Sequence, residues 1–160
     1  KMVNVTEHNT VGVLNSLIII NNDRIEGYKI ASNETTETDL KALFSNFIET
    51  SEQCRNELVV EVSKLGGTPN EYTILIGGFF LDLMDVKVAL TANNRKVILD
   101  SCKYSERVAL EKYKNVLIQE VNDINLKEQN MLNNHYELLK SDYDKIRELR
   151  KAINIKKRIQ

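Results

Sequence analysis

The stretch LDSCKYSERVALEKYKNV, residues 99–116, decides the fold of this chain. Its apolar side chains recur at alternating spacings of three and four residues, which places them on one side of an α-helix. A helix of this kind must bury its apolar side against neighbouring helices. The stretch therefore predicts one helix of a bundle, whose inward positions are Leu99, Cys102, Glu106, Ala109, Tyr113 and Val116.

Four further segments show the same spacing. Pro69 is the only proline among the 160 residues, so little interrupts the helices. Glycine accepts the left-handed conformation that closes a helix, so the Gly66-Gly67 pair before Pro69 ends the second helix. Residues 66–78 either cross the bundle or belong in part to the third helix. We expect five helices, at about 10–32, 40–65, 80–90, 95–121 and 124–157.

These helices predict an all-α protein with a single domain over residues 1–160. The core is a four-helix bundle over about 10–122, followed by an additional long C-terminal helix over about 124–157. That last helix has an apolar stripe that a closed four-helix bundle does not need, so it packs on the outside or meets another chain. Because symmetric pairs are the commonest oligomers, we expect a homodimer to which it contributes. The stripe is Leu132, Tyr136, Leu139, Tyr143 and Ile146.

Composition limits the classes of function. The chain is 42% hydrophobic and 28% charged, as in soluble globular proteins, and its net charge of −1 favours neither nucleic acid nor membrane as a partner. Cys54 and Cys102 fall within the apolar stripes, so we expect inert core thiols and a reducing, cytoplasmic location. The excess of basic residues at 140–160 complements the dipole of the last helix, with an acidic partner or a lipid surface as the alternative.

Glu106 is the most informative polar residue, because it occupies an inward position. An unpaired buried carboxylate costs several kcal/mol, so it must be paired, protonated, bound to a metal, or turned to the edge of the bundle. Three other carboxylates each lie one residue from the apolar stripe of a different helix. Four carboxylates on four helices could converge on a hard cation: Glu26, Glu52, Asp85 and Glu106.

The histidines that a dinuclear iron site uses are absent. Such bundles combine single glutamates with Glu-x-x-His pairs, whereas here Arg55 follows Glu52 and Ala109 follows Glu106 at that spacing. Arg55 would also place a positive charge where the cation binds. We therefore expect no metal or other cofactor, and Arg55 either pairs with Glu106 or both reach solvent. The alternative is an iron or manganese site formed by these carboxylates. Acid-base catalysis by them is the least favoured of the three interpretations.

Several stretches resemble an uncharacterised bacterial family of ferritin-like four-helix bundles, a domain of unknown function distantly similar to rubrerythrins. The LGGTP element followed by MDVK is the more specific part, and together the stretches cover nearly the whole chain. They are LNSLIIINNDRIEGYKIAS (14–32), ELVVEVSKLGGTP (57–69), MDVKVAL (84–90), DSCKYSERVALEKY (100–113) and SDYDKIRELRKA (141–152).

The resemblance implies a ferritin-like bundle with an added C-terminal helix and an unassigned function. Rubrerythrin-like metal roles would transfer onto Glu26, Glu52 and Glu106, but Arg55 and Ala109 depart from the family's histidine pattern. A fold alone does not supply its chemistry. We expect a non-catalytic protein that acts by self-association or partner binding, with a carboxylate-based metal-binding protein (di-iron or di-manganese storage or oxidase) as the alternative.

Overall fold

A computed structural model describes residues 5–71 and 88–159. All elements described are helical, which confirms the all-α prediction, and residues 88–91 are helical as well. None of the described helices combines the length and apolar character needed to cross a bilayer. The elements are α1 (Val5–Glu34), α2 (Thr38–Lys64), α5 (Arg95–Gln119), the short 3-10 helix η1 (Val121–Asp123) and α6 (Leu126–Ile159).

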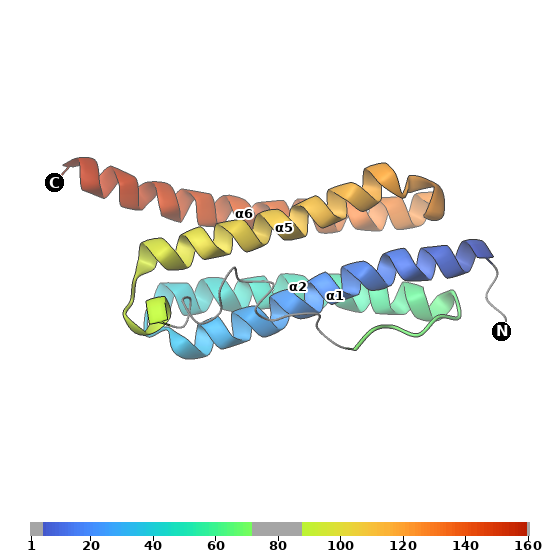
Figure 1. Cartoon of the computed structure of the whole chain (residues 1–160), viewed down its shortest axis with the longest axis horizontal. Helices are drawn as coiled ribbons and strands as arrows, with labels where there is room; N and C mark the ends of the chain where they lie inside the picture. Colours follow the sequence, from blue (N-terminus) through green and yellow to red (C-terminus); the bar gives the residue numbers. More distant parts are fainter. Residues whose placement is uncertain (1–4, 72–87, 160) are drawn as a thin grey trace.

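The four long helices form two antiparallel hairpins, α1 with α2 and α5 with α6, that pack against each other lengthwise (Figure 1). α2 and α5 run in the same direction, so α5 begins at the opposite end of the bundle from the end of α2. The residues that join them include 72–87, and the two alternatives for 66–78 therefore lie largely outside the described residues. η1 lies at the boundary that we expected between the helices at about 95–121 and 124–157.

The C-terminal helix is one of the four bundle helices, which corrects the prediction that it is an addition to a closed bundle. Leu132, Leu139 and Ile146 of α6 are fully buried in the core, and Tyr136 and Tyr143 pack partly buried against it. The predicted third helix, 80–90, lies outside the described residues up to position 87. Periodicity reveals an apolar stripe but not which neighbour covers it, so the sequence could not show that α6 packs within the bundle.

The apolar core consists of two clusters, one toward each end of the bundle. Cys54 and Cys102 are buried free thiols, as expected from their positions in the stripes. Between the clusters every long helix places polar side chains inward. The first cluster comprises Tyr28, Ala31, Leu40, Leu43, Phe44, Phe47, Ala89, Leu90, Ile98, Leu99, Cys102 and Ile146. The second comprises Val13, Leu14, Leu17, Ile18, Leu58, Val62, Leu110, Tyr113, Val116, Ile124, Leu132 and Leu139.

The glycine pair after α2 explains how that helix ends. Gly66 has a φ of 79°, in the left-handed region that favours glycine, as the sequence predicts. Gly67 is needed for space, because a Cβ there would lie 2.6 Å from Cγ1 of Val11 and 3.2 Å from Cγ1 of Val62. The pair therefore lets the end of α2 pack directly on the start of α1.

Candidate functional site

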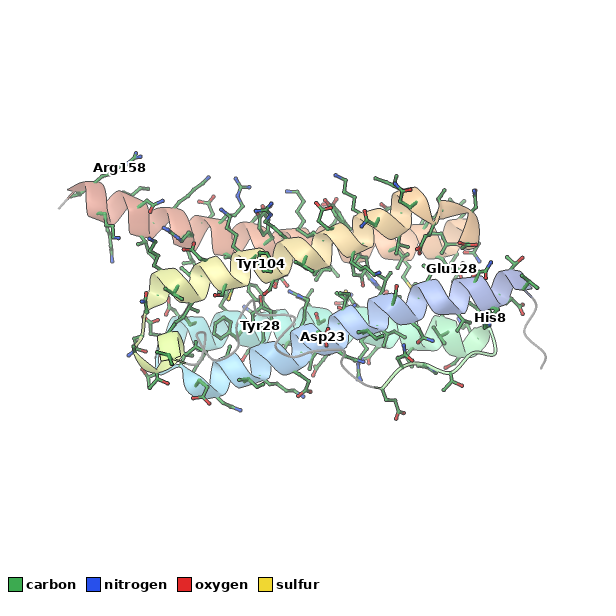
Figure 2. The ribbon with its side chains drawn as sticks, in the orientation of Figure 1. His8, Asp23, Tyr28, Tyr104, Glu128 and Arg158 are labelled. Atoms are coloured by element: carbon green, nitrogen blue, oxygen red, sulfur yellow. The ribbon has the colours of Figure 1, made fainter. Side chains whose placement is uncertain are left out.

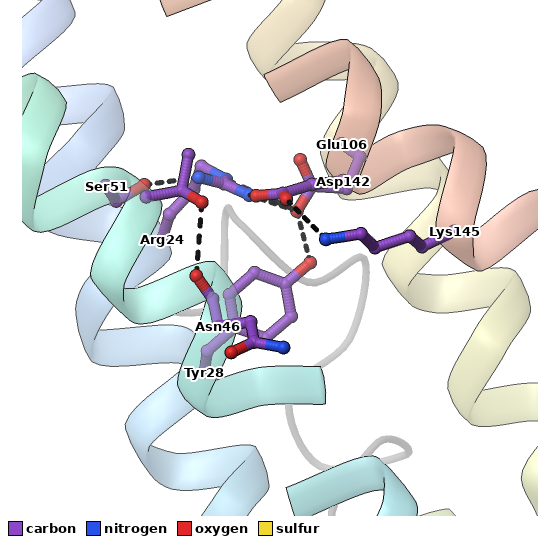
Figure 3. Close-up of polar contacts among 8 residues, drawn as sticks. Arg24, Tyr28, Asn46, Ser51, Glu106, Asp142 and Lys145 are labelled. Atoms are coloured by element: carbon purple, nitrogen blue, oxygen red, sulfur yellow. Dashed lines mark hydrogen bonds and ion pairs between the residues drawn. The ribbon is translucent and has the colours of Figure 1, made fainter. Parts of the chain in front are cut away.

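A polar layer separates the two apolar clusters, and each long helix contributes one side chain to it (Figure 3). Arg24 comes from α1, Ser51 from α2, Glu106 from α5 and Asp142 from α6. The first three are completely buried, and Asp142 is 3% exposed. The layer therefore joins all four helices through contacts that water does not reach freely.

The guanidinium of Arg24 is the centre of this layer. Its Nη2 lies 2.7 Å from Oε1 of Glu106 and 3.1 Å from Oδ2 of Asp142. Its Nε also donates to Oε1 of Glu106 over 3.2 Å, and its Nη1 donates to Oγ of Ser51. The planar fork of donors suits this use, since one arginine binds three other helices at once. Breaking one side of such a buried pair typically costs about 3–5 kcal/mol.

Two buried carboxylates share this single guanidinium. Burial raises the pKa of Glu106 above its usual value, while Arg24 opposes that rise through its charge and hydrogen bonds. Burial likewise raises the pKa of Asp142, again opposed by Arg24. The hydroxyl of Tyr28 donates to Oε1 of Glu106, and Nζ of Lys145 lies 4.0 Å from Oδ1 of Asp142. The carboxylates are thus held by hydrogen bonds and charge rather than by solvent.

Sequence reasoning missed Arg24 as the partner of Glu106. Arg24 lies three residues after Asn21 and four before Tyr28, both of which are buried, so helical spacing places it on the inward face of α1. These three- and four-residue spacings could therefore have identified Arg24 as an inward residue. Asp142 was less visible, because it lies between Leu139 and Ile146 on a helix whose partners periodicity does not identify.

The predicted pairing of Arg55 with Glu106 is wrong. Arg55 is half-buried on α2, its Nη2 lies 3.5 Å from Oδ1 of the neighbouring Asn56, and Glu106 pairs with Arg24 instead. The physical reason is position on the helix: Ser51 and Cys54 are the fully buried residues of this part of α2, and Arg55 lies to one side of them.

The four candidate carboxylates do not come together in the described structure. Glu26 is 46% exposed and pairs with Lys29 at 3.6 Å. Glu26 and Glu52 line a small hollow of about 140 Å³ on the surface, together with Arg55. Glu106 is in the buried layer, away from that hollow, and Asp85 lies outside the described residues. Of the three that the structure describes, only Glu106 contributes to the buried centre.

A second polar chain lies on the other side of Arg24, within the cluster that contains Tyr113. Asn21 donates to the hydroxyl of Tyr113 over 2.9 Å, and that hydroxyl lies 3.1 Å from Nδ1 of His135. Nε2 of His135 points toward Glu57, 3.6 Å from its Oε1. Burial lowers the pKa of His135, and the Glu57 carboxylate opposes this. His135 lies next to Tyr136 of the apolar stripe of α6 in the sequence, and its side chain is completely buried.

The buried centre does not fit a divalent ion. Nη2 of Arg24 lies within hydrogen-bond distance of both carboxylates, so a cation between them would meet a fixed positive charge. Ala109 and Lys145, not histidines, stand three residues after Glu106 and Asp142. Oε2 of Glu106 has no hydrogen-bond partner among the described residues, but one free oxygen is not a ligand set. Within 5–71 and 88–159, no group of three or more His, Cys, Asp or Glu side chains is placed to hold a metal.

Comparison with known families assigns the chain a relationship but no activity. The chain belongs to the family described as Domain of unknown function (DUF2383), whose model matches residues 9–120. No curated protein matches the chain. The family membership agrees with the expectation of an uncharacterised family, and it covers α1, α2 and α5 while ending before α6.

Proposed function

Because this family carries no assigned activity, we propose from the geometry that the protein is a non-catalytic helical bundle that acts through its outer surface, by self-association or by binding a partner. The observation that supports this is the Arg24 centre. Its charges are satisfied within the chain by Glu106 and Asp142 and are closed off from solvent. A group that reacts with a substrate must be reachable, and these groups are buried among four helices.

The same proposal accounts for the resemblance to ferritin-like bundles. In dimetal bundles of that class, carboxylates from all four helices point inward and meet at a cation, and one long connection crosses the bundle. Here one polar side chain from each helix meets in the same way, and α2 and α5 run in parallel. We propose that the guanidinium of Arg24 takes the place of the cation, so that the arrangement is retained for structure. Buried charged groups of this kind have been linked to helix register and uniqueness.

We further propose a cytoplasmic location. Cys54 and Cys102 are buried free thiols, and burial raises the pKa of Cys54 to about 12. Thiols of this kind are compatible with a reducing compartment and have no role as nucleophiles at neutral pH.

Elemental analysis tests the proposal against its alternative, a carboxylate-based iron or manganese protein. The protein is expressed in medium supplemented with both metals and compared with Glu106→Ala, and with Asp142→Asn in case the first variant does not fold. We expect no stoichiometric iron or manganese in any of the three. One or more tightly held ions per chain, lost in either variant, would establish the alternative.

A further inference from the structure

Exposed apolar side chains gather on one helix of the bundle, α5. Among the described residues, α5 carries four large apolar side chains along its length that are 38–59% exposed. α2 carries one, Val60, and the three on α6, Leu126, Ile155 and Ile159, lie near the ends of that helix. The spacings between the four are seven, four and ten residues, which keeps them on one side of the helix. They are Val97, Tyr104, Val108 and Ile118.

A groove of about 460 Å³ accompanies this side of α5. Tyr104 and Val108 form its apolar lining from α5, and Ile20 adds to it from the neighbouring α1. Figure 2 shows Tyr104 on α5, where this helix runs beside α1. The exposed stripe is therefore continuous with one apolar side chain, Ile20, of a second helix.

Three charged residues line the groove, Arg107, Glu111 and Lys112, and the first two can form complementary pairs across a two-fold axis. Arg107 and Glu111 are one helical turn apart, both exposed, and both line the groove. Neither makes an ion pair or hydrogen bond to another residue of the described structure. Two copies of α5 related by a two-fold axis in antiparallel orientation would bring each arginine near the other copy's glutamate, since a two-fold makes every contact twice.

We propose that this stripe of α5 binds a second copy of the chain, with the two α5 helices antiparallel across a two-fold axis. This inference rests on the proposed function and names the partner. The axis passes beside Arg107 and Val108, which places Val97 opposite the partner's Ile118. Arg107 then lies within one turn of the partner's Glu111. We place the contact on α5 and not on α6, as the sequence led us to expect, because Leu132, Leu139 and Ile146 of α6 are buried within its own bundle.

The available area is sufficient for such a pair. α5 has 25 residues and is about 37 Å long at about 1.5 Å per residue. Together with the edge of α1, roughly 10 Å away, it offers a strip about 20 Å wide. That corresponds to roughly 700 Å² per chain, near the ~800 Å² per partner of a standard interface.

Charge exchange tests the proposed pairing. The molar mass of the full-length protein in solution is measured by light scattering for the natural sequence, Arg107→Glu, and the double variant Arg107→Glu/Glu111→Arg. We expect a dimer that Arg107→Glu weakens by about tenfold or more and that the double variant restores, because only the exchange recreates opposite charges across the axis. Loss of the dimer in both variants, or in neither, would overturn the register.

Two matched cysteine variants, one on α5 and one on α2, test which face of the bundle binds the second copy. Val108→Cys should form a disulfide-linked dimer on mild oxidation. Val60→Cys should not, although Val60 on α2 is also exposed, at 52%. The native thiols are buried and do not compete. A metal-free protein that remains monomeric at the highest concentration used contradicts this inference alone and leaves other partners as the proposed function. Stoichiometric metal contradicts the proposed function itself.

Discussion

Replacement of the central guanidinium should be among the most damaging single substitutions in this chain. Arg24→Met keeps the length of the side chain and removes the charge, leaving Glu106 and Asp142 buried with no cation between them. Breaking a buried pair in this way costs about 3–5 kcal/mol, a large part of the ~5–15 kcal/mol that stabilises a typical domain. Urea unfolding, followed by circular dichroism, measures this loss of stability. The midpoint urea concentration should fall, while the dependence of the unfolding free energy on urea stays unchanged.

Arg55→Met is the matched control, since Arg55 is half-buried and its one described polar contact is with Asn56 at 3.5 Å. We expect it to cost less than about 1 kcal/mol. A double-mutant cycle then shows whether Arg24 acts through Glu106: Arg24→Met and Glu106→Gln together should cost clearly less than the sum of the two. Equal small losses for Arg24→Met and Arg55→Met, or strictly additive effects in the cycle, would refute the reasoning.

Three further predictions concern packing, pH and the fourth helix. Gly67→Ala should destabilise the protein by about 1–3 kcal/mol in the same urea assay, because its Cβ would collide with the start of α1, whereas Gly12→Ala, with open space around it, should stabilise by about 0.5–1 kcal/mol. Because burial lowers the pKa of His135 below 6.5, the unfolded chain takes up the proton more readily; stability should fall as the pH drops below about 6.5, and His135→Gln should reduce this slope. A chain ending after Asp123 lacks α6 and should show no cooperative thermal transition; a sharp one would mean that α6 is dispensable.

The sequence was sufficient for the class of fold and for most helix boundaries. Alternating three- and four-residue spacings identified α1, α2, α5 and α6, and Gly66 marked the end of α2. It was insufficient for the assembly of the helices, since an amphipathic stripe on α6 is equally compatible with the core, the outside and another chain. Only tertiary packing shows that α6 completes the bundle.

The same distinction holds at the buried centre. Glu106 could be identified as an interior charge because it replaces an apolar residue at an inward position. Helical spacing can place Arg24 on the inward face of α1, but it cannot assign Arg24 and not Arg55 to Glu106, because the two arginines lie on different helices and either is long enough to reach it. Which arginine reaches Glu106 depends on how α1 and α2 are rotated about their axes. A shift of one residue along a helix changes the direction of a side chain by about 100°.

Anomalous X-ray scattering from crystals of the protein, grown after expression with added iron and manganese, tests the central claim most directly. Data collected at the absorption edges of the two metals locate any ion with respect to Glu106 and Asp142. We predict no anomalous peak between these carboxylates and continuous density for the Arg24 side chain in contact with both. A strong anomalous peak from an ion bound to either carboxylate, with Arg24 turned away, would contradict the claim that a guanidinium takes the place of a metal in this bundle.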